Sequence, residues 1–119
     1  MIELNITTEQ RITNAIIWIE ALKSGKYQKG VRALGIENEG KWSYCCLGVG
    51  CKALNIDEIY AKGFSYKFAY EVGLTTEMGY FDFSRDCLTN CNDLTYKDDT
   101  DFTNMVRVIL ENIDDLFID

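Results

Sequence analysis

The chain of 119 residues is 47% hydrophobic and 13% aromatic, a composition that excludes a disordered protein and predicts one packed domain over residues 1–119. Its net charge of −7 argues against bulk attraction to duplex DNA or RNA. The sequence shows neither a membrane-length apolar run nor the basic and apolar segments of a secretory signal, so we expect a cytoplasmic protein without membrane contact.

The charge is unevenly distributed. Residues 1–60 carry seven basic and seven acidic side chains, so the acidic excess lies in the second half. A basic cluster after the first predicted helix has two interpretations, a solvated turn favoured by the helix dipole or a contact for phosphate. We favour the solvated turn, because runs of charge usually lie on solvated faces. The cluster consists of Lys23, Lys26, Lys29 and Arg32.

The first elements are predicted from spacing. Alternating apolar residues over 2–6 predict a short strand. Thr7 and Gln10 then form a capping-box pattern, which predicts that a helix begins there, and Gly25 is a plausible stop for it. The apolar residues of this helix recur at helical spacing and are Ile12, Ala15, Ile16, Ile19 and Leu22.

The middle of the chain predicts two strands and a short helix. Residues 31–36 and 41–45 are expected to pair around a turn at residues 37–40. The densest apolar run follows and predicts a helix over residues 46–54 at the centre of the core. Because glycine weakens a helix, its two glycines suggest that another backbone packs closely against it.

The second half contains weaker signals. Aromatic alternation over residues 64–68 predicts a strand, although a helix continuing to residue 72 competes with it. A strand over residues 80–83, a polar turn over 87–93 and a helix from Phe102 to the C-terminus complete the pattern. The sequence therefore predicts an α+β domain, with an antiparallel sheet of short strands packed against N-terminal, central and C-terminal helices.

The five cysteines admit three interpretations. Their spacing fits a zinc site poorly, and a nucleophilic thiol has no histidine to act as its base, because the chain contains none. We therefore expect thiols that pack as small apolar groups, reduced and free of metal. They are Cys45, Cys46, Cys51, Cys87 and Cys91.

Six aspartates crowd a short region of the second half. Carboxylates can hold Mg²⁺ or act as acid and base, but they also favour helix N-termini and solvent. We favour the second interpretation and expect no catalytic residue, metal or cofactor. The aspartates are Asp82, Asp86, Asp93, Asp98, Asp99 and Asp101.

Three segments carry a resemblance to a known family. They are W-I-E-A-L-K-S-G-K-Y at residues 18–27, the Y-C-C-L-G-V corner at 44–49 and L-T-N-C-N-D at 88–93, followed by the helix from Phe102. In order and spacing they resemble small phage and prophage proteins, best matched by the phage Thoeris anti-defence sponge proteins of the first type. The resemblance implies a homo-oligomer in the host bacterial cytoplasm. It would sequester, without cleavage, a cyclic ADP-ribose isomer made by bacterial TIR proteins, and could also hold cyclic oligonucleotides.

The resemblance also implies a binding site. The family reads adenine with an aromatic ring and an asparagine, and binds phosphates with arginine. Asn92 of the third motif would contact the adenine edge, and either Phe81 or Phe83 would stack on the base. The alternative is a phage structural or adaptor protein that makes protein–protein contacts. The residues expected to bind the ligand are Phe81, Phe83, Arg85, Asn92, Asp93 and Arg107.

Overall fold

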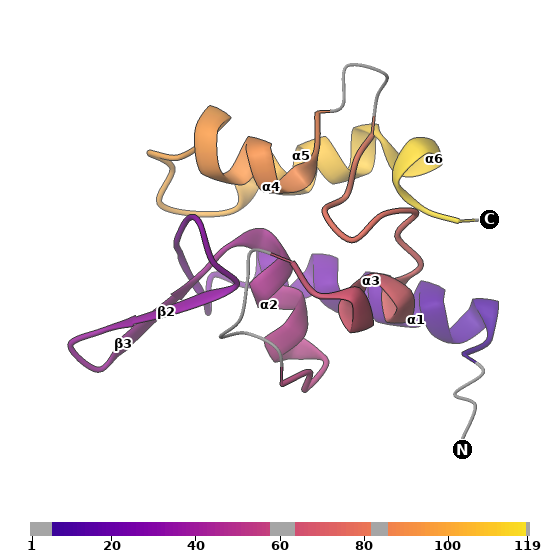
Figure 1. Ribbon diagram of the computed structural model, residues 1–119, viewed down its shortest axis with the longest axis horizontal. Coiled ribbons are helices and arrows are strands. Elements are labelled where there is room, and N and C mark those ends of the chain that lie inside the picture. The colour runs from indigo at the N-terminus through magenta and orange to yellow at the C-terminus, as the bar shows by residue number, and fades with distance from the viewer. Residues whose placement is uncertain (1–5, 58–63, 82–85, 119) are drawn as a thin grey trace.

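A computed structural model describes residues 6–57, 64–81 and 86–118. In Figure 1 the helices lie in two groups, with α1, α2 and α3 in one and α4, α5 and α6 in the other, and a β-hairpin projects from the first group. Among the described residues no helix is both long and apolar enough to cross a bilayer. The helices are α1 (Thr8–Lys23), α2 (Cys46–Ala53), α3 (Tyr66–Val72), α4 (Leu88–Asn90), a π-helical turn η1 (Cys91–Thr95), α5 (Thr103–Glu111) and α6 (Ile113–Leu116).

The sheet has the strand order β1-β3-β2 and is mixed. β2 (Gly35–Asn38) pairs antiparallel with β3 (Lys41–Tyr44), as expected for a hairpin, but β1 (Gln28–Lys29) runs parallel to β3. The α+β class is confirmed and the purely antiparallel sheet was wrong. The cause is the segment between β1 and β2, where Arg32 adopts φ 75° and turns the chain, so that the predicted strand over 31–36 begins only at Gly35.

The first helix begins as its sequence predicts. The Thr7 hydroxyl accepts a hydrogen bond from the Gln10 amide at 3.1 Å, and the Gln10 side chain accepts one from the Thr7 amide at 3.1 Å. The capping box is thus confirmed. The helix ends at Lys23, and Gly25 follows with φ 76°, a left-handed conformation that suits glycine.

The structure determines the form of two predicted segments in the second half of the chain. Of the two interpretations of residues 64–72, the structure has the helix: α3 begins at Tyr66, and Ser65 caps it by accepting a hydrogen bond from the Phe68 amide at 3.1 Å. The last helix divides at Asn112 into α5 and α6, because Asn112 leaves the helical conformation and its side-chain Nδ2 donates to the Val108 carbonyl at 2.8 Å.

Two other predicted strands lie mainly outside the described residues. Of the strand over 2–6 the structure describes only Ile6, which lies in no strand. Of the strand over 80–83 it describes Tyr80, which forms an isolated antiparallel bridge with Cys87, and Phe81.

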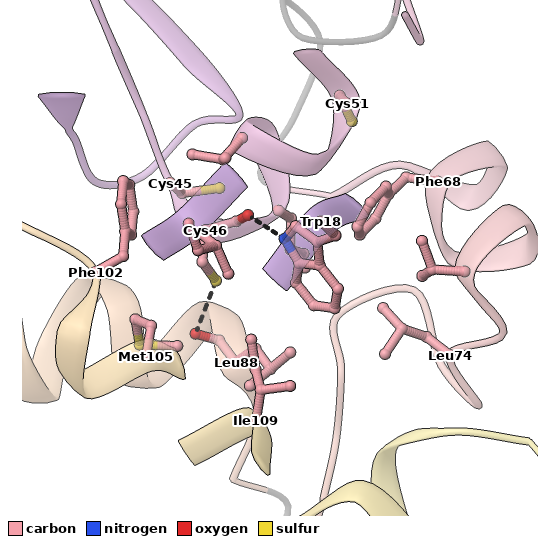
Figure 2. Packing of buried hydrophobic residues seen from close by; sticks show 14 of the residues in the cluster. Trp18, Cys45, Cys46, Cys51, Phe68, Leu74, Leu88, Phe102, Met105 and Ile109 are labelled. Carbon is pink, nitrogen blue, oxygen red and sulfur yellow. Dashed lines mark hydrogen bonds between the residues drawn. The ribbon is translucent and has the colours of Figure 1, made fainter. Parts of the chain in front are cut away.

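The core is centred on Trp18, whose indole is fully buried beneath α2 (Figure 2). Its Nε1 donates to the Cys46 carbonyl at 2.8 Å, and its ring meets Phe68 edge to face at 4.9 Å. The expected close approach of another backbone is confirmed at Gly48, because a Cβ there would clash with the Leu34 carbonyl. All five cysteines are buried as free thiols, which confirms that part of the prediction.

Candidate functional site

The structure describes four of the six predicted ligand residues, namely Phe81, Asn92, Asp93 and Arg107. Phe83 and Arg85 lie outside the described residues. Phe81 is half-buried against the core, and its amide donates to the Asp86 carbonyl at 3.1 Å. The side chains of Asn92 and Asp93 are hydrogen-bonded to each other, whereas Arg107 lies on α5.

Asn92 has a structural task in this fold. Its side chain is fully buried, and its Oδ1 accepts from the Cys46 amide at 3.2 Å. Its Nδ2 donates to the Gly30 carbonyl at 3.0 Å and to the Asp93 carboxylate at 2.8 Å. Contact with an adenine edge would require breaking these bonds, because the oxygen and the nitrogen of the side chain both have partners in the fold.

The bond to Cys46 explains why an asparagine is needed at this position. The first amides of a helix have no partner within the helix, and a side chain just before the helix usually caps them. Cys45, which precedes α2, makes no side-chain cap bond. Asn92 supplies the missing acceptor from η1, a segment far along the sequence, and so joins the two halves of the chain.

Lys29 also connects the first half of the chain to η1. Its amine donates to the carbonyls of Asn92 at 3.1 Å and Tyr96 at 2.7 Å, at the two ends of η1. These bonds tie β1 to the π-helical turn. Such turns are rare and occur frequently at functional sites.

Arg107 of α5 contacts the hydroxyl end of Tyr96. Its Nη2 donates to the Tyr96 hydroxyl at 3.0 Å and to Asn104 Oδ1 at 3.1 Å, and its Nη1 lies 3.8 Å from the Glu111 carboxylate. The arginine side chain is 53% exposed. Tyr96 thus contacts one cation through its carbonyl and another through its hydroxyl. We call Lys29, Tyr96, Asn104 and Arg107 the Tyr96 site.

Sequence reasoning placed Arg107 correctly on a helix but missed Tyr96 and the role of Lys29. Lys29 belongs to the basic cluster, for which a solvated turn and a phosphate contact were considered, and its amine instead binds two backbone carbonyls. Lys23, from the same cluster, forms an exposed ion pair with Glu20 at 3.5 Å. No local spacing could have indicated the Tyr96 contacts, because they join residues far apart in the sequence.

Two of the buried thiols are poor nucleophiles at neutral pH. Burial raises the pKa of Cys45 to about 11, and burial also raises the pKa of Cys46 well above its usual value. The Cys46 thiol lies 4.0 Å from the Leu88 carbonyl, inside the core (Figure 2). Because the thiolate is the reactive form, these two groups are poor nucleophiles.

An apolar groove lies on a different face, between α1 and α6. Its volume is about 320 Å³, and we call it the α1–α6 groove. Ile12 and Ile16 of α1 line it and are 56% and 55% exposed. Its other lining residues are Thr8, Arg11, Ala15, Ile19, Val72, Gly73, Ile113, Asp114, Phe117 and Ile118.

Comparison with known proteins adds no assignment. No protein-family model matches the chain, and neither a curated protein nor a solved structure matches it. The resemblance therefore remains an expectation based on the three sequence segments.

Proposed function

We propose that the chain is a non-catalytic binding protein that captures a cyclic adenine nucleotide, such as a cyclic ADP-ribose isomer, and holds it intact. In the cytoplasm of a bacterial host this capture would remove an immune signal, the anti-defence role that the resemblance implies. The observation that carries the proposal is the Tyr96 site, where an exposed guanidinium is bonded to the hydroxyl of a tyrosine whose backbone carbonyl accepts from a second cation, Lys29.

Arg107 is suited to a phosphate for two reasons. Its planar guanidinium matches two phosphate oxygens at once, which the point charge of lysine does not. Tyr96 and Asn104 both accept from the same nitrogen, so the side chain is partly ordered before a ligand arrives. A phosphate would compete with Glu111, but an exposed ion pair such as this contributes little stability.

The base requires a different partner from the one the motif implied. Asn92 is committed to the fold and is not assigned the adenine edge, so in this proposal the base is held by stacking on an aromatic ring near Arg107. Tyr96 is half-buried and meets Arg107 directly, which makes it the best-placed ring among the described residues. Phe81 is half-buried and remains a second candidate. Base stacking on such rings tolerates different bases, consistent with a binding protein for several cyclic nucleotides.

The test is calorimetric titration of the purified protein with cyclic ADP-ribose isomers and cyclic dinucleotides. We expect one of them to bind and Arg107→Ala to weaken it by about 1.5–3 kcal/mol, or roughly 10- to 150-fold. Lys97→Ala, an exposed cation outside the site, is the matched control and should bind as the wild type does. Unchanged binding in Arg107→Ala would place the ligand elsewhere.

The fate of the ligand separates capture from catalysis. Heating the saturated protein should release the nucleotide chemically intact. A hydrolysed product would show that the protein is an enzyme. The proposal also includes the homo-oligomer that the resemblance implies.

A second candidate function is that of an adaptor that acts through protein–protein contacts. The α1–α6 groove favours it, because clustered apolar side chains at a surface mark contact sites. If the folded protein binds none of the cyclic nucleotides, the adaptor function becomes the better explanation.

A further inference from the structure

We propose that the α1–α6 groove is the surface through which two copies of this chain associate, related by a two-fold axis. The inference rests on the self-association included in the proposed function, and it adds the surface and the pairing. The groove has exposed apolar side chains and a neutral lining, and both features support this association.

The apolar exposure is concentrated here. Ile12, Ile16, Ile113 and Ile118 all line the groove, and each is between 45% and 56% exposed. Single exposed apolar residues are ordinary on a protein surface, but a cluster of four isoleucines around one hollow is not. Covering them in a second copy would bury apolar surface that the isolated chain leaves in water.

Two of the exposed isoleucines form one wall of the groove. Ile12 and Ile16 are four residues apart on α1, so they stand next to each other as a ridge on one side of the hollow. In a two-fold contact the same patch is used by both partners. The ridge of each copy can then enter the hollow of the other.

The charge of the groove supports the same occupant. Among the described lining residues Arg11 and Asp114 are the charged ones, so the lining is neutral although the chain carries −7. A two-fold axis between them would bring Arg11 of each copy near Asp114 of the other. Contacts through strongly acidic faces would instead bring like charges together.

Arg11 is held at the rim before any partner arrives. Its Nε donates to the Tyr70 carbonyl at 3.2 Å, and its guanidinium lies 4.8 Å from the centre of the Tyr70 ring. The two terminal nitrogens project from a fixed base, which reduces the entropy lost on pairing with a carboxylate. We therefore expect the charge pair to determine the register of the two copies.

The first experiment measures molar mass by light scattering and sedimentation, without any nucleotide. The wild type should exceed the 13.6 kDa of one chain. Ile16→Asp should return the protein to one chain, because it places a charge in the apolar contact. Leu94→Asp is the matched control, since Leu94 is 64% exposed but lies on η1, and it should leave the mass unchanged.

The second experiment reverses the charge pair. Arg11→Glu and Asp114→Arg should each weaken association at least tenfold, because each places like charges opposite one another. Combining both reversals should restore it. This rescue depends on the two-fold pairing and would not follow if the single changes merely damaged the fold, which thermal unfolding of each variant checks independently.

The outcomes distinguish the surface from self-association as such. A wild type that remains one chain at the highest soluble concentration would overturn both. A wild type that associates, together with folded Ile16→Asp and charge-reversed variants that associate equally well, would overturn the groove alone. Nucleotide capture is measured at Arg107 and is unaffected by either result.

Discussion

Asn92 shows how one side chain can hold two segments together. Its side chain is fully buried and hydrogen-bonds to the first backbone amide of α2, to the Gly30 carbonyl and to the neighbouring Asp93 carboxylate. A buried polar group without a partner costs more than a hydrogen bond gains. The position should therefore be sensitive to substitution even if no ligand ever contacts it.

Asn92→Ala should destabilise the fold by about 2–4 kcal/mol, because it removes the partner of the buried Cys46 amide and of the partly buried Gly30 carbonyl. Urea unfolding followed by circular dichroism measures the loss. Asn38→Ala, at an exposed position of β2, is the control and should change stability little. If Asn92→Ala were as stable as the wild type but no longer bound nucleotide, Asn92 would be a ligand contact after all.

The buried thiols give the stability a pH dependence. The pKa of Cys45 is about 11 in the fold, against an ordinary value of 9.0, and the pKa of Cys46 is raised too. Above its ordinary pKa a thiol loses its proton in the unfolded chain but keeps it in the folded one. Stabilisation is thus complete below about pH 9 and is lost as the pH rises through the folded pKa.

We therefore expect the free energy of unfolding to fall between about pH 9 and pH 11, by roughly 2–3 kcal/mol for a two-unit shift. Urea midpoints measured across this range test the prediction. Tyrosines and lysines also titrate near this range, so Cys45→Ala is the matched comparison. An equally steep fall in the Cys45→Ala variant would assign the effect to other groups.

At the level of elements, the close packing around α2 leaves no room for a side chain at its two glycines. A Cβ on Gly48 would clash with the carbonyl of Leu34, and one on Gly50 would clash with the Phe68 ring. Alanine would gain about 1 kcal/mol of helix propensity over glycine. A clash with backbone cannot be relieved by a side-chain rotation, so we expect the steric cost to exceed this gain.

Gly48→Ala should accordingly destabilise the fold by an amount typical of an overpacked core, about 1–3 kcal/mol. The thermal unfolding midpoint should fall with it. Lys52→Ala, an exposed position on the same helix, is the control and should leave the midpoint nearly unchanged. A Gly48→Ala variant more stable than the wild type would show that α2 and the Leu34 backbone can separate at little cost.

The elements that sequence could predict are those with strong local signals. The capping box at Thr7, the apolar run of α2 and the turn between β2 and β3 all act over a few residues. The alternation that suggested a strand near Tyr66 was misleading, because residues two apart share one face of a strand but lie on opposite faces of the helix that forms here. Tyr66 is 67% exposed and Phe68 is buried, as that geometry requires.

The candidate site was less accessible to sequence reasoning. The motif correctly marked Asn92 as an important position but not what it does, since a buried asparagine and a ligand-reading asparagine look alike in a sequence. Tyr96 gained its place from Lys29 and Arg107, which reach it from β1 and α5. The parallel pairing of β1 likewise depends on a turn at Arg32, and the residue types there did not predict a turn.

At the scale of the whole molecule, contacts between the two halves should make unfolding cooperative. Trp18 packs against Phe117, and Asn92 bonds to Cys46 and Gly30. Separating the two halves would leave the Asn92 side chain and the Cys46 amide without these partners, so no partly folded state should be well populated.

Trp42→Phe isolates the fluorescence of Trp18 and tests this prediction. Trp42 is half-exposed on the hairpin, so its replacement should cost little. We expect the unfolding curve from Trp18 fluorescence to coincide with that from far-ultraviolet circular dichroism. Separate midpoints would show that α1 and its neighbours unfold independently of part of the molecule.

The bond from Asn92 to the Cys46 amide also creates a natural reporter for hydrogen exchange. An amide in the first turn of a helix ordinarily exchanges with solvent deuterium quickly, because fraying at the helix end exposes it. Here the acceptor comes from η1 and is buried, so local fraying of α2 does not release it. The amide can exchange only when the two halves of the chain separate, and its exchange rate therefore reports the free energy of that separation in the native protein.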